Sequence, residues 1–443
     1  MMMTFSQLAA WIEQQQWHSL AQWLPTQHVI RLSDAVAKLS LAQQIRLFTQ
    51  VSEAAPAFEY LPEAYQVQLA QHLPMPILAQ LTAQMHSDQR TDFYLLLAPD
   101  LQQQLLAQLA PQQQQQLQVL AAYPAESAGA MMSSDFVTLA PDMQIADAIA
   151  ALRQSAADRE TLYLLYVVDD QQKLLGVISL RQLIQAAPEQ WVSEIMSQDL
   201  ITGGVDEDQE KIALSLAHYR FLALPIVDAA QRLVGIVTYD DAMQVLNAES
   251  YEDFLKSSAV QTDGAPSLKS TSIWVLYKNR VFWLVILVFG SLLSGIGIAY
   301  FEEIIAQNLV LVFFLPLLVG SGGNAGSQSA TLMVRALATG DVELKDWFGL
   351  LGRESLVALA LGTTMALAVS ILGYLRGDFW VAVVLALSML GIVLLGCLIG
   401  MSLPFILNKL KLDPASASAP LVTSICDATG VVVYLFIASL LLF

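Results

Sequence analysis

The sequence predicts a multidomain protein with four parts. These are an all-α N-terminal domain of repeated short helices, an α/β tandem repeat, one connecting helix, and an all-α membrane domain with five spans. Of the 443 residues, 55% are apolar and only 14% are charged, against about 25% in ordinary soluble domains. The net charge is −5 on residues 1–130, −13 on residues 131–265 and 0 on residues 266–443. We therefore expect two acidic soluble parts followed by a membrane part.

Residues 1–128 are predicted to form a cytosolic helical domain. Leu-Pro and Ala-Pro steps such as Pro62, Pro74 and Pro111 punctuate the segment at intervals of about 12 residues. The residue before a proline is pushed out of the helical region, so each step separates two short helices and the period predicts a helical stack. Asp88 and Asp92 are four residues apart and share a helix face, where they are either cation ligands or ordinary surface charges.

Residues 129–241 contain an internal repeat. Met132 and Met196 begin the two copies, and Gly176 and Gly235 mark the same place in each copy. Apolar β-branched runs alternate with helical patterns, so each copy predicts a helix, a strand, a turn, a second strand and a helix. The pattern resembles a tandem pair of CBS domains, which implies a regulatory module that binds a small ligand such as an adenosine nucleotide or a metal.

One nucleotide site is suggested by the second copy of the repeat. Thr238 and Asp241 follow its glycine and resemble the ribose-contacting pair of nucleotide-binding CBS domains. Asp241 is equally consistent with a solvated helix N-terminus, so binding of ATP stays open.

Residues 242–268 are predicted to connect the repeat to the membrane. A helix is expected over residues 242–260, followed by a hinge over residues 262–267 that contains Gly, Pro and Ser. Glu249, Glu252 and Asp253 lie three and four residues apart on this helix, where like charges repel. A divalent cation that bridges them to other acidic groups would remove the repulsion.

Residues 269–443 are predicted to form the membrane domain. The apolar runs are long enough to cross a bilayer, and they cover residues 281–301, 308–337, 356–375, 380–407 and 417–443. Most basic residues near the span ends lie on the side of the N-terminal domains: Lys269, Lys278, Arg280, Arg335, Lys345, Arg353, Lys409 and Lys411. Arg376 alone lies in a connection on the other side. We expect a multi-pass protein of the plasma membrane (the bacterial inner membrane), with the N-terminus cytoplasmic and the C-terminus outside.

Two spans carry polar residues that a plain anchor does not need. The second contains a Gly- and Ser-rich stretch with Gly323 and Asn324, which predicts either a tight packing face or the lining of a wet path. The fifth contains Thr423 and Asp427, and a carboxylate inside a bilayer is a functional-site hypothesis, with a structural carboxylate as the alternative. No lysine or arginine is predicted deep in a span, so a cation from solution is the expected partner of Asp427. Mg²⁺ keeps several waters and meets one or two carboxylates.

Together these residues resemble the MgtE family of magnesium channels over essentially the whole chain. The most specific motifs are residues 322–329 with 335–340, and residues 420–423 with 427–430. The resemblance implies a homodimer with the pore between its subunits and Asp427 as the pore aspartate that binds hydrated Mg²⁺. Thr423, Asn324 and Gly323 are grouped with Asp427 as pore residues.

The same resemblance implies that the channel is gated by cytosolic Mg²⁺. The connecting helix matches the family's plug helix, with Mg²⁺ shared among acidic residues that hold the pore shut when Mg²⁺ is high. The candidate regulatory carboxylates are Asp88, Asp92, Asp228, Glu249, Glu252, Asp253 and Asp413. Ala419 stands where some relatives carry Asn, and Gln244 and Asn247 stand where acids are expected, which should weaken or shift the Mg²⁺ sensor.

Other classes fit the sequence less well. A secondary transporter coupled to Na⁺ or H⁺ is the main alternative, because an intramembrane Asp and a broken, glycine-rich span are also typical of transporters. A membrane-anchored nucleotide sensor would leave Asp427 without a role. No H-E-x-x-H or nucleophile–base spacing indicates an enzyme, and the net charge of −18 argues against a nucleic-acid partner. Selectivity among Mg²⁺, Mn²⁺ and Co²⁺ stays open.

Overall fold

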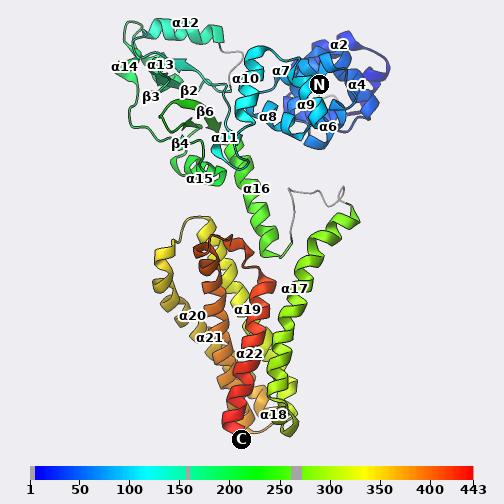
Figure 1. Ribbon diagram of the computed structural model, residues 1–443, viewed down its shortest axis with the longest axis vertical. Coiled ribbons are helices and arrows are strands. Elements are labelled where there is room, and N and C mark those ends of the chain that lie inside the picture. Colours follow the sequence, from blue (N-terminus) through cyan, green and yellow to red (C-terminus); the bar gives the residue numbers. More distant parts are fainter. Residues whose placement is uncertain (1–4, 156–159, 261–271, 443) are drawn as a thin grey trace. The chain divides into compact units, whose positions relative to one another are not determined.

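The computed structural model describes residues 5–155, 160–260 and 272–442, and the chain divides into two compact units, Met1–Leu246 and Asn247–Phe443. Figure 1 shows the chain coloured along its sequence. The predicted hinge over residues 262–267 and the predicted boundary residue Lys269 lie outside the described residues.

The N-terminal part of the first unit consists of short helices. They are α1 (Phe5–Glu13), α2 (Trp17–Trp23), α3 (Val29–Val36), α4 (Leu41–Gln50), α5 (Ala55–Glu59), α6 (Glu63–Ala70), α7 (Met75–Gln84), α8 (Ser87–Leu96), α9 (Pro99–Leu106) and α10 (Pro111–Leu120). From α6 to α10 each helix begins 12 residues after the one before it. Pro62 and Pro74 occupy the N-cap positions of α6 and α7, and Pro99 and Pro111 open α9 and α10. This periodic punctuation confirms the predicted stack of short helices.

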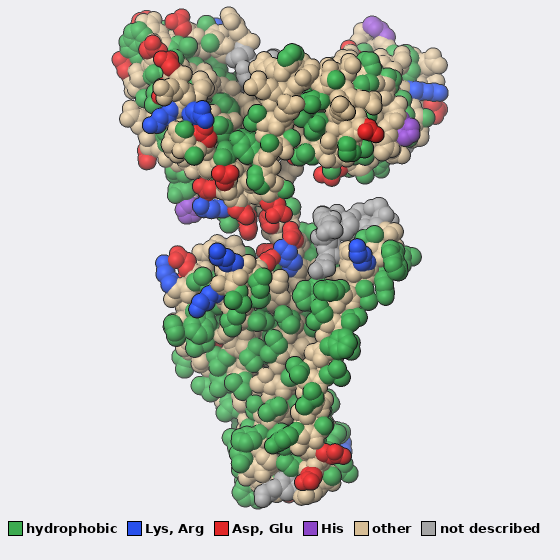
Figure 2. Space-filling view, viewed as in Figure 1, with side chains coloured by type: hydrophobic (Ala, Val, Ile, Leu, Met, Phe, Trp, Pro, Cys, Tyr) green, Lys and Arg blue, Asp and Glu red, His purple; other side chains and the backbone are tan. Residues whose placement is uncertain are grey.

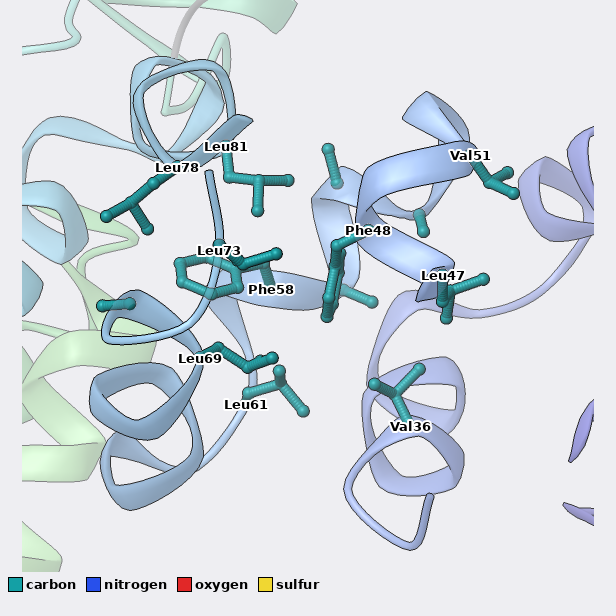
Figure 3. Packing of buried hydrophobic residues seen from close by; sticks show 14 of the residues in the cluster. Val36, Leu47, Phe48, Val51, Phe58, Leu61, Leu69, Leu73, Leu78 and Leu81 are labelled. Atoms are coloured by element: carbon teal, nitrogen blue, oxygen red, sulfur yellow. The ribbon is translucent and has the colours of Figure 1, made fainter. Parts of the chain in front are cut away.

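The core of this helical domain consists of aromatic and aliphatic side chains from successive helices (Figure 3). Phe58 packs edge-to-face against Phe48 and Phe93, with ring centroids 5.6 and 5.3 Å apart. Buried glutamines satisfy the carbonyl groups at helix ends: Gln66 Nε2 donates to the carbonyls of Phe58 and Glu59, each at 2.9 Å. Some of the glutamine-rich composition is therefore structural, because these side chains replace the missing intrahelical partners of terminal carbonyls.

The remainder of the first unit is the predicted tandem repeat. The first copy contains β1 (Thr138–Leu139), α12 (Ile145–Ser155), β2 (Leu164–Val168), β3 (Leu174–Ser179) and α13 (Leu180–Gln185). The second contains β4 (Gly203–Gly204), α15 (Gln209–Tyr219), β5 (Ala223–Val227), β6 (Leu233–Thr238) and α16 (Tyr239–Ser257). Two further short helices, α11 (Ala128–Met131) and α14 (Val192–Ile195), precede the first strand of the copies. Each copy has a parallel two-residue strand added to an antiparallel pair. The predicted helix, strand, turn, strand and helix are confirmed, and the added strands are too short for sequence periodicity to show.

Methionine and glycine landmarks of the repeat hold its two copies together. Met196 packs against Gly176 and Met132 against Gly235, so that a Cβ on either glycine would lie within 2.6 Å of a methionine sulfur. Each methionine therefore fills the space that a glycine leaves in a strand of the other copy. This close packing explains why both residues recur in both copies.

Among the described residues of the second unit, 247–260 and 272–442, five helices are long and apolar enough to cross a membrane. They belong to α17 (Ile273–Tyr300), α19 (Val310–Ala338), α20 (Trp347–Arg376), α21 (Phe379–Lys409) and α22 (Ala419–Leu442), with a short α18 (Glu302–Gln307) after α17. Figure 2 shows hydrophobic side chains over most of the visible face of this unit. The number of spans is as predicted. α17 and α20 begin earlier than predicted, because their first turns carry the Trp, Lys and Arg residues typical of a membrane interface.

The glycine-rich stretch of α19 is a continuous helix, so the prediction of a broken span is wrong. The reason is close packing against α21. A Cβ on Gly400 would collide with the carbonyl oxygen of Gly326, and a Cβ on Gly396 would lie 2.5 Å from the carbonyl oxygen of Gly322. Small residues at these positions bring the two helix backbones together without interrupting their hydrogen bonds.

Candidate ion-binding sites

The packing of α19 against α22 brings three of the predicted pore residues together. A Cβ built on Gly323 would lie 2.9 Å from Thr423 Cγ2 and 3.2 Å from Asp427 Oδ1. Gly323 therefore leaves open the space directly beside the Asp427 carboxylate. Asn324, the next residue on α19, is exposed on the surface of the unit.

Hydroxyl groups extend this site along the same two helices. Ser327 Oγ and Thr423 Oγ1 are 3.0 Å apart, and Thr423 Oγ1 donates to the carbonyl of Ala419 at 2.8 Å. In contrast, Asp427 Oδ1 is buried and has no hydrogen-bond partner among the described residues. A buried carboxylate oxygen without a donor is costly, and a cation is the partner that compensates it best.

A second carboxylate inside the membrane unit was not predicted. Glu354 lies seven residues after the start of α20, about 10 Å along the helix axis. Its Oε1 accepts a hydrogen bond from Ser329 Oγ on α19 at 2.5 Å. The prediction missed it because the third apolar run was taken to begin at residue 356. The signal that could have found it is the aromatic and basic segment at residues 347–353, which marks an earlier helix start.

In the first unit, several predicted residues meet in a cavity of about 360 Å³, here called the acidic cavity. Its acidic lining residues are Glu59, Glu63, Asp88, Asp92, Glu160, Asp240 and Asp241. They come from the helical domain and from both copies of the repeat, so the folded unit collects acidic groups that are up to 182 positions apart. His86 also lines the cavity.

Asp88 is the most deeply buried of these carboxylates. It is 4% exposed, and its Oδ1 has no hydrogen-bond partner among the described residues. Burial raises the pKa of Asp88. Two residues before it, His86 donates from Nδ1 to Glu59 Oε1 at 2.6 Å, and this hydrogen bond is the main cause that raises the pKa of His86 to about 9. His86 is therefore a protonated cation at neutral pH.

Two further carboxylates of the acidic cavity have pKa values well above the ordinary range. Burial, followed by the charge of Asp88, raises the pKa of Glu160 to about 8 and that of Asp241 to about 7. Thr238 Oγ1 lies within hydrogen-bond distance of both Asp240 and Asp241. Asp241 thus belongs to the acidic cavity as well as to the predicted nucleotide pair, a link that sequence spacing does not show.

The acidic cavity does not form a preassembled cage for a bare ion. Across residues 5–155, 160–260 and 272–442, no three His, Cys, Asp or Glu side chains converge closely enough to hold a metal directly. Mg²⁺, however, usually keeps several waters and contacts one or two carboxylates. The cavity volume, the unpartnered Asp88 oxygen and the surrounding carboxylates are compatible with a hydrated ion.

Asp228 is placed outside the acidic cavity. It lies in the turn between β5 and β6, where Oδ1 accepts from the backbone N–H of Ala230 and Arg232, each at 2.9 Å. Its Oδ2 pairs with the Arg232 side chain at 2.6 Å. The backbone hydrogen bond from Arg232 is the main cause that lowers the pKa of Asp228.

The acidic residues of α16 form a separate cluster within the second unit. Burial, followed by the charge of Asp413, raises the pKa of Asp253 to about 6. Lys256 donates from Nζ to Glu252 Oε1 at 2.5 Å and to Asp413 Oδ2 at 2.6 Å. Although burial opposes it, hydrogen bonding to Asp413 and Glu252 raises the pKa of Lys256. The contact between α16 and Asp413 is thus made by a lysine that the sequence analysis did not single out.

Comparison with known proteins matches the helical domain, the repeat and most of the membrane domain. Residues 27–126 match the MgtE intracellular N domain, residues 128–189 and 192–248 match CBS domains, and residues 315–437 match MgtE, a divalent cation transporter. The magnesium transporter MgtE of Thermus thermophilus is 40% identical over 340 residues, which cover 77% of this chain and 75% of that protein. The chain belongs to the MgtE family. The family member of Bacillus subtilis, also named magnesium transporter MgtE, is 34% identical over 75% of this chain and 74% of that protein.

Solved structures of magnesium-transport proteins agree with this assignment for the first unit. The soluble part of a magnesium transporter superposes with a TM-score of 0.53 at 28% identity, covering 55% of this chain and 96% of that one. The cytosolic domain of the Mg²⁺ channel MgtE in complex with ATP superposes with a TM-score of 0.52 at 31% identity, covering 55% and 100%.

Family membership confirms several predictions. MgtE proteins are magnesium transporters, so the chain is a transport protein and not an enzyme. Its five apolar helices make it a multi-pass membrane protein, and Mg²⁺ is the substrate of its family. The predicted fold, a helical N domain followed by a CBS pair and five membrane helices, is also confirmed.

Proposed function

We propose that this MgtE protein is a Mg²⁺-selective channel that is closed by cytosolic Mg²⁺ and mediates magnesium uptake. The observation that carries the permeation site is the buried, unpartnered Oδ1 of Asp427 beside Gly323 and Thr423. In a homodimer with two-fold symmetry, two such carboxylates would face one axis. One hydrated Mg²⁺ between them would satisfy both, with the side-chain oxygens of Thr423 and Asn324 accepting hydrogen bonds from its waters.

The proposed gate uses the acidic cavity and the acidic face of α16. At low Mg²⁺ the carboxylates of the cavity, among them Asp88, Asp92 and Asp241, repel one another, which favours separation of the helical domain from the CBS pair. At high Mg²⁺ hydrated ions neutralise them and favour the compact arrangement, so one ion species controls a distant pore through its differential binding to two states. Glu249, Glu252, Asp253 and Asp413 would respond in the same direction at α16. Asp228, which already forms an ion pair with Arg232, would contribute least to this response to Mg²⁺.

ATP is proposed as a second ligand of the CBS pair. The support is the ATP complex of the similar cytosolic domain, together with the paired Thr238 and Asp241 side chains. Because Asp241 also lines the acidic cavity, a nucleotide at this pair would alter the charge that Mg²⁺ meets there.

The proposed topology places the N-terminus in the cytoplasm and the C-terminus outside the plasma membrane. In the second unit, basic side chains are concentrated at one end of the helices (Figure 2), which is the end expected on the cytoplasmic side. This orientation exposes the acidic cavity to cytosolic Mg²⁺, as the gating proposal requires.

The test is Mg²⁺ influx into proteoliposomes that contain the full-length protein, measured at low and at millimolar Mg²⁺ on the cytoplasmic face. Asp427→Asn should abolish influx, because the amide removes the charge while keeping the shape. Glu302→Gln is the matched control, because Glu302 is exposed at the opposite end of the helices from the predicted regulatory acids. Influx that persists in Asp427→Asn would refute the permeation site, and influx unaffected by cytoplasmic Mg²⁺ would refute the gate.

A secondary transporter coupled to Na⁺ or H⁺ is the competing function, and Glu354 is the observation that favours it. A second intramembrane carboxylate bonded to Ser329 is the kind of group that carries protons in coupled transporters. The same vesicles decide between the two functions. A channel conducts Mg²⁺ without a Na⁺ or H⁺ gradient, whereas a coupled transporter stops when both gradients are collapsed. Repeating the influx with Mn²⁺ and Co²⁺ would establish selectivity.

A further inference from the structure

Lys256 occupies the position at which a bridging cation would be expected on α16. Its ammonium group contacts Glu252 on the same helix and Asp413 in the connection between α21 and α22. Both contacts lie within the second unit, which includes α16 from Asn247 onward. Of the two, only the contact with Asp413 joins α16 to the membrane helices.

Asp413 is itself held in a fixed orientation. Its Oδ1 accepts from the backbone N–H of Ala415 at 2.8 Å and caps a short 3₁₀ turn, Pro414–Ser416, which leads directly into α22. Ala415 and Ala417 pack with Val334 of α19. The Lys256–Asp413 ion pair therefore connects α16 to a turn that contacts α19 and immediately precedes α22. These are the two helices that carry the proposed pore residues.

We propose that Lys256 is a resident cation that docks α16 on the membrane domain in the absence of Mg²⁺. This inference deepens the proposed gating function and rests on it. Mg²⁺ then adds to a contact that already exists instead of creating it. At zero Mg²⁺ a fraction of the channel molecules therefore stays closed, and the Lys256–Asp413 contact determines the size of that fraction.

The charges around Lys256 leave room for both cations. Glu249, Glu252, Asp253 and Asp413 carry four negative charges, and Lys256 supplies one positive charge, so the cluster keeps a net charge of −3 and continues to attract Mg²⁺. An ammonium group and a metal ion cannot occupy the same side of Asp413 Oδ2. Mg²⁺ therefore binds through the remaining carboxylates, or it displaces the lysine from Asp413.

The contribution of Lys256 to docking is limited by solvent. The side chains of Lys256 and Asp413 are each 36% exposed, and exposed ion pairs change an equilibrium by about 1.5- to 5-fold. The bond to Glu252 forms within α16 and persists when the helix undocks. We therefore expect a two- to fivefold effect on the docked fraction, carried by the Asp413 contact alone.

The experiment measures docking directly and does not depend on ion flux. Spin labels at Ser250→Cys on α16 and Leu410→Cys at the end of α21 report the distance between these elements in full-length protein by pulsed electron resonance. Both positions are exposed, whereas the native Cys397 and Cys426 are buried and stay unlabelled. Distances are recorded in EDTA and across a Mg²⁺ titration for Lys256→Gln, Lys256→Arg and Lys345→Gln. Lys345 is the matched control, because it forms an exposed ion pair with Glu343 in the connection between α19 and α20.

In EDTA, Lys256→Gln should lower the short-distance population two- to fivefold, Lys256→Arg should restore it, and Lys345→Gln should leave it unchanged. At millimolar Mg²⁺, all variants should reach the docked distance. An unchanged population in Lys256→Gln, or an equal loss in Lys345→Gln, would overturn the proposal. If Asp427→Asn still conducts while Lys256→Gln undocks, the pore assignment fails and the role of Lys256 in docking stands.

Discussion

Replacing Glu160 by Gln should remove a large part of the pH dependence of the stability of the first unit. The pKa of Glu160 is about 8 in the folded protein, against about 4.3 for a glutamate in an unfolded chain. Between these values the folded state holds a proton that the unfolded state has released. The free energy of unfolding therefore falls as the pH rises through this window, and it is highest below it.

The magnitude follows from the same two pKa values. Between pH 6 and pH 8 the unfolded chain is already deprotonated at this position, whereas the folded protein loses its proton only near pH 8. Integrating the difference gives a loss of about 2 kcal/mol in the free energy of unfolding. This corresponds to an increase of about thirtyfold in the equilibrium constant for unfolding. The Glu160 side chain is only 13% exposed, so screening by solvent is small. His86, Asp88, Asp240 and Asp241 also face Glu160 and remain in the variant, so a shallower slope persists.

The assay is native-state hydrogen exchange of the full-length protein in Mg²⁺-free buffer, followed in peptides that cover α8 and corrected for the intrinsic effect of pH. Wild type should lose about 2 kcal/mol more protection between pH 6 and pH 8 than Glu160→Gln. Glu189→Gln, an exposed acid of the same unit, should follow wild type. Millimolar Mg²⁺ should reduce the difference by neutralising the ionised cavity. Equal pH slopes in wild type and Glu160→Gln would refute the reasoning.

Two packing predictions concern the scaffolds that position the sites. Gly400→Ala places a methyl group against the Gly326 carbonyl and should destabilise the α19–α21 contact by about 1–3 kcal/mol. Thermal unfolding in detergent would show this, whereas Gly320→Ala, which faces open space, should unfold as wild type does. Phe58→Ala should cost about 3–5 kcal/mol in the helical domain, because both aromatic contacts of a fully buried ring are lost. Hydrogen exchange in α5 and α8 would measure it, and an unchanged protection factor would contradict the assigned core.

The order of the parts was predictable because each has a distinct local signature. Pro62, Pro74, Pro99 and Pro111 mark the starts of α6, α7, α9 and α10, since proline favours the first positions of a helix. The five membrane helices follow from apolar length alone. Their ends were less predictable, because helical structure continues past the apolar core into interfacial residues such as Trp347.

In the membrane domain, the predicted ion-binding carboxylate was the one whose charge was out of place. Asp427 stood out because a carboxylate in an apolar run is costly, and the structure brings it beside Gly323 and Thr423. Glu354 and Lys256 were missed because each lies where a charged residue is ordinary: one at a helix start, the other near the end of an exposed helix. Their partners, Ser329 and Asp413, are remote in sequence, so only the folded structure assigns them a contact.

The two clusters that the proposed gate uses have the same electrostatic arrangement. In the acidic cavity His86 is protonated at neutral pH and pairs with Glu59, and in the α16 cluster Lys256 pairs with Asp413. In both clusters the acidic groups outnumber the resident cation, so a negative charge remains for mobile cations to neutralise once the carboxylates have ionised. A cluster without a resident cation would separate fully at low Mg²⁺, and one with matched charges would not respond to Mg²⁺ at all. In the proposed gate, partial neutralisation by the protein's own cations would therefore keep each cluster close to assembly and leave the last step to Mg²⁺.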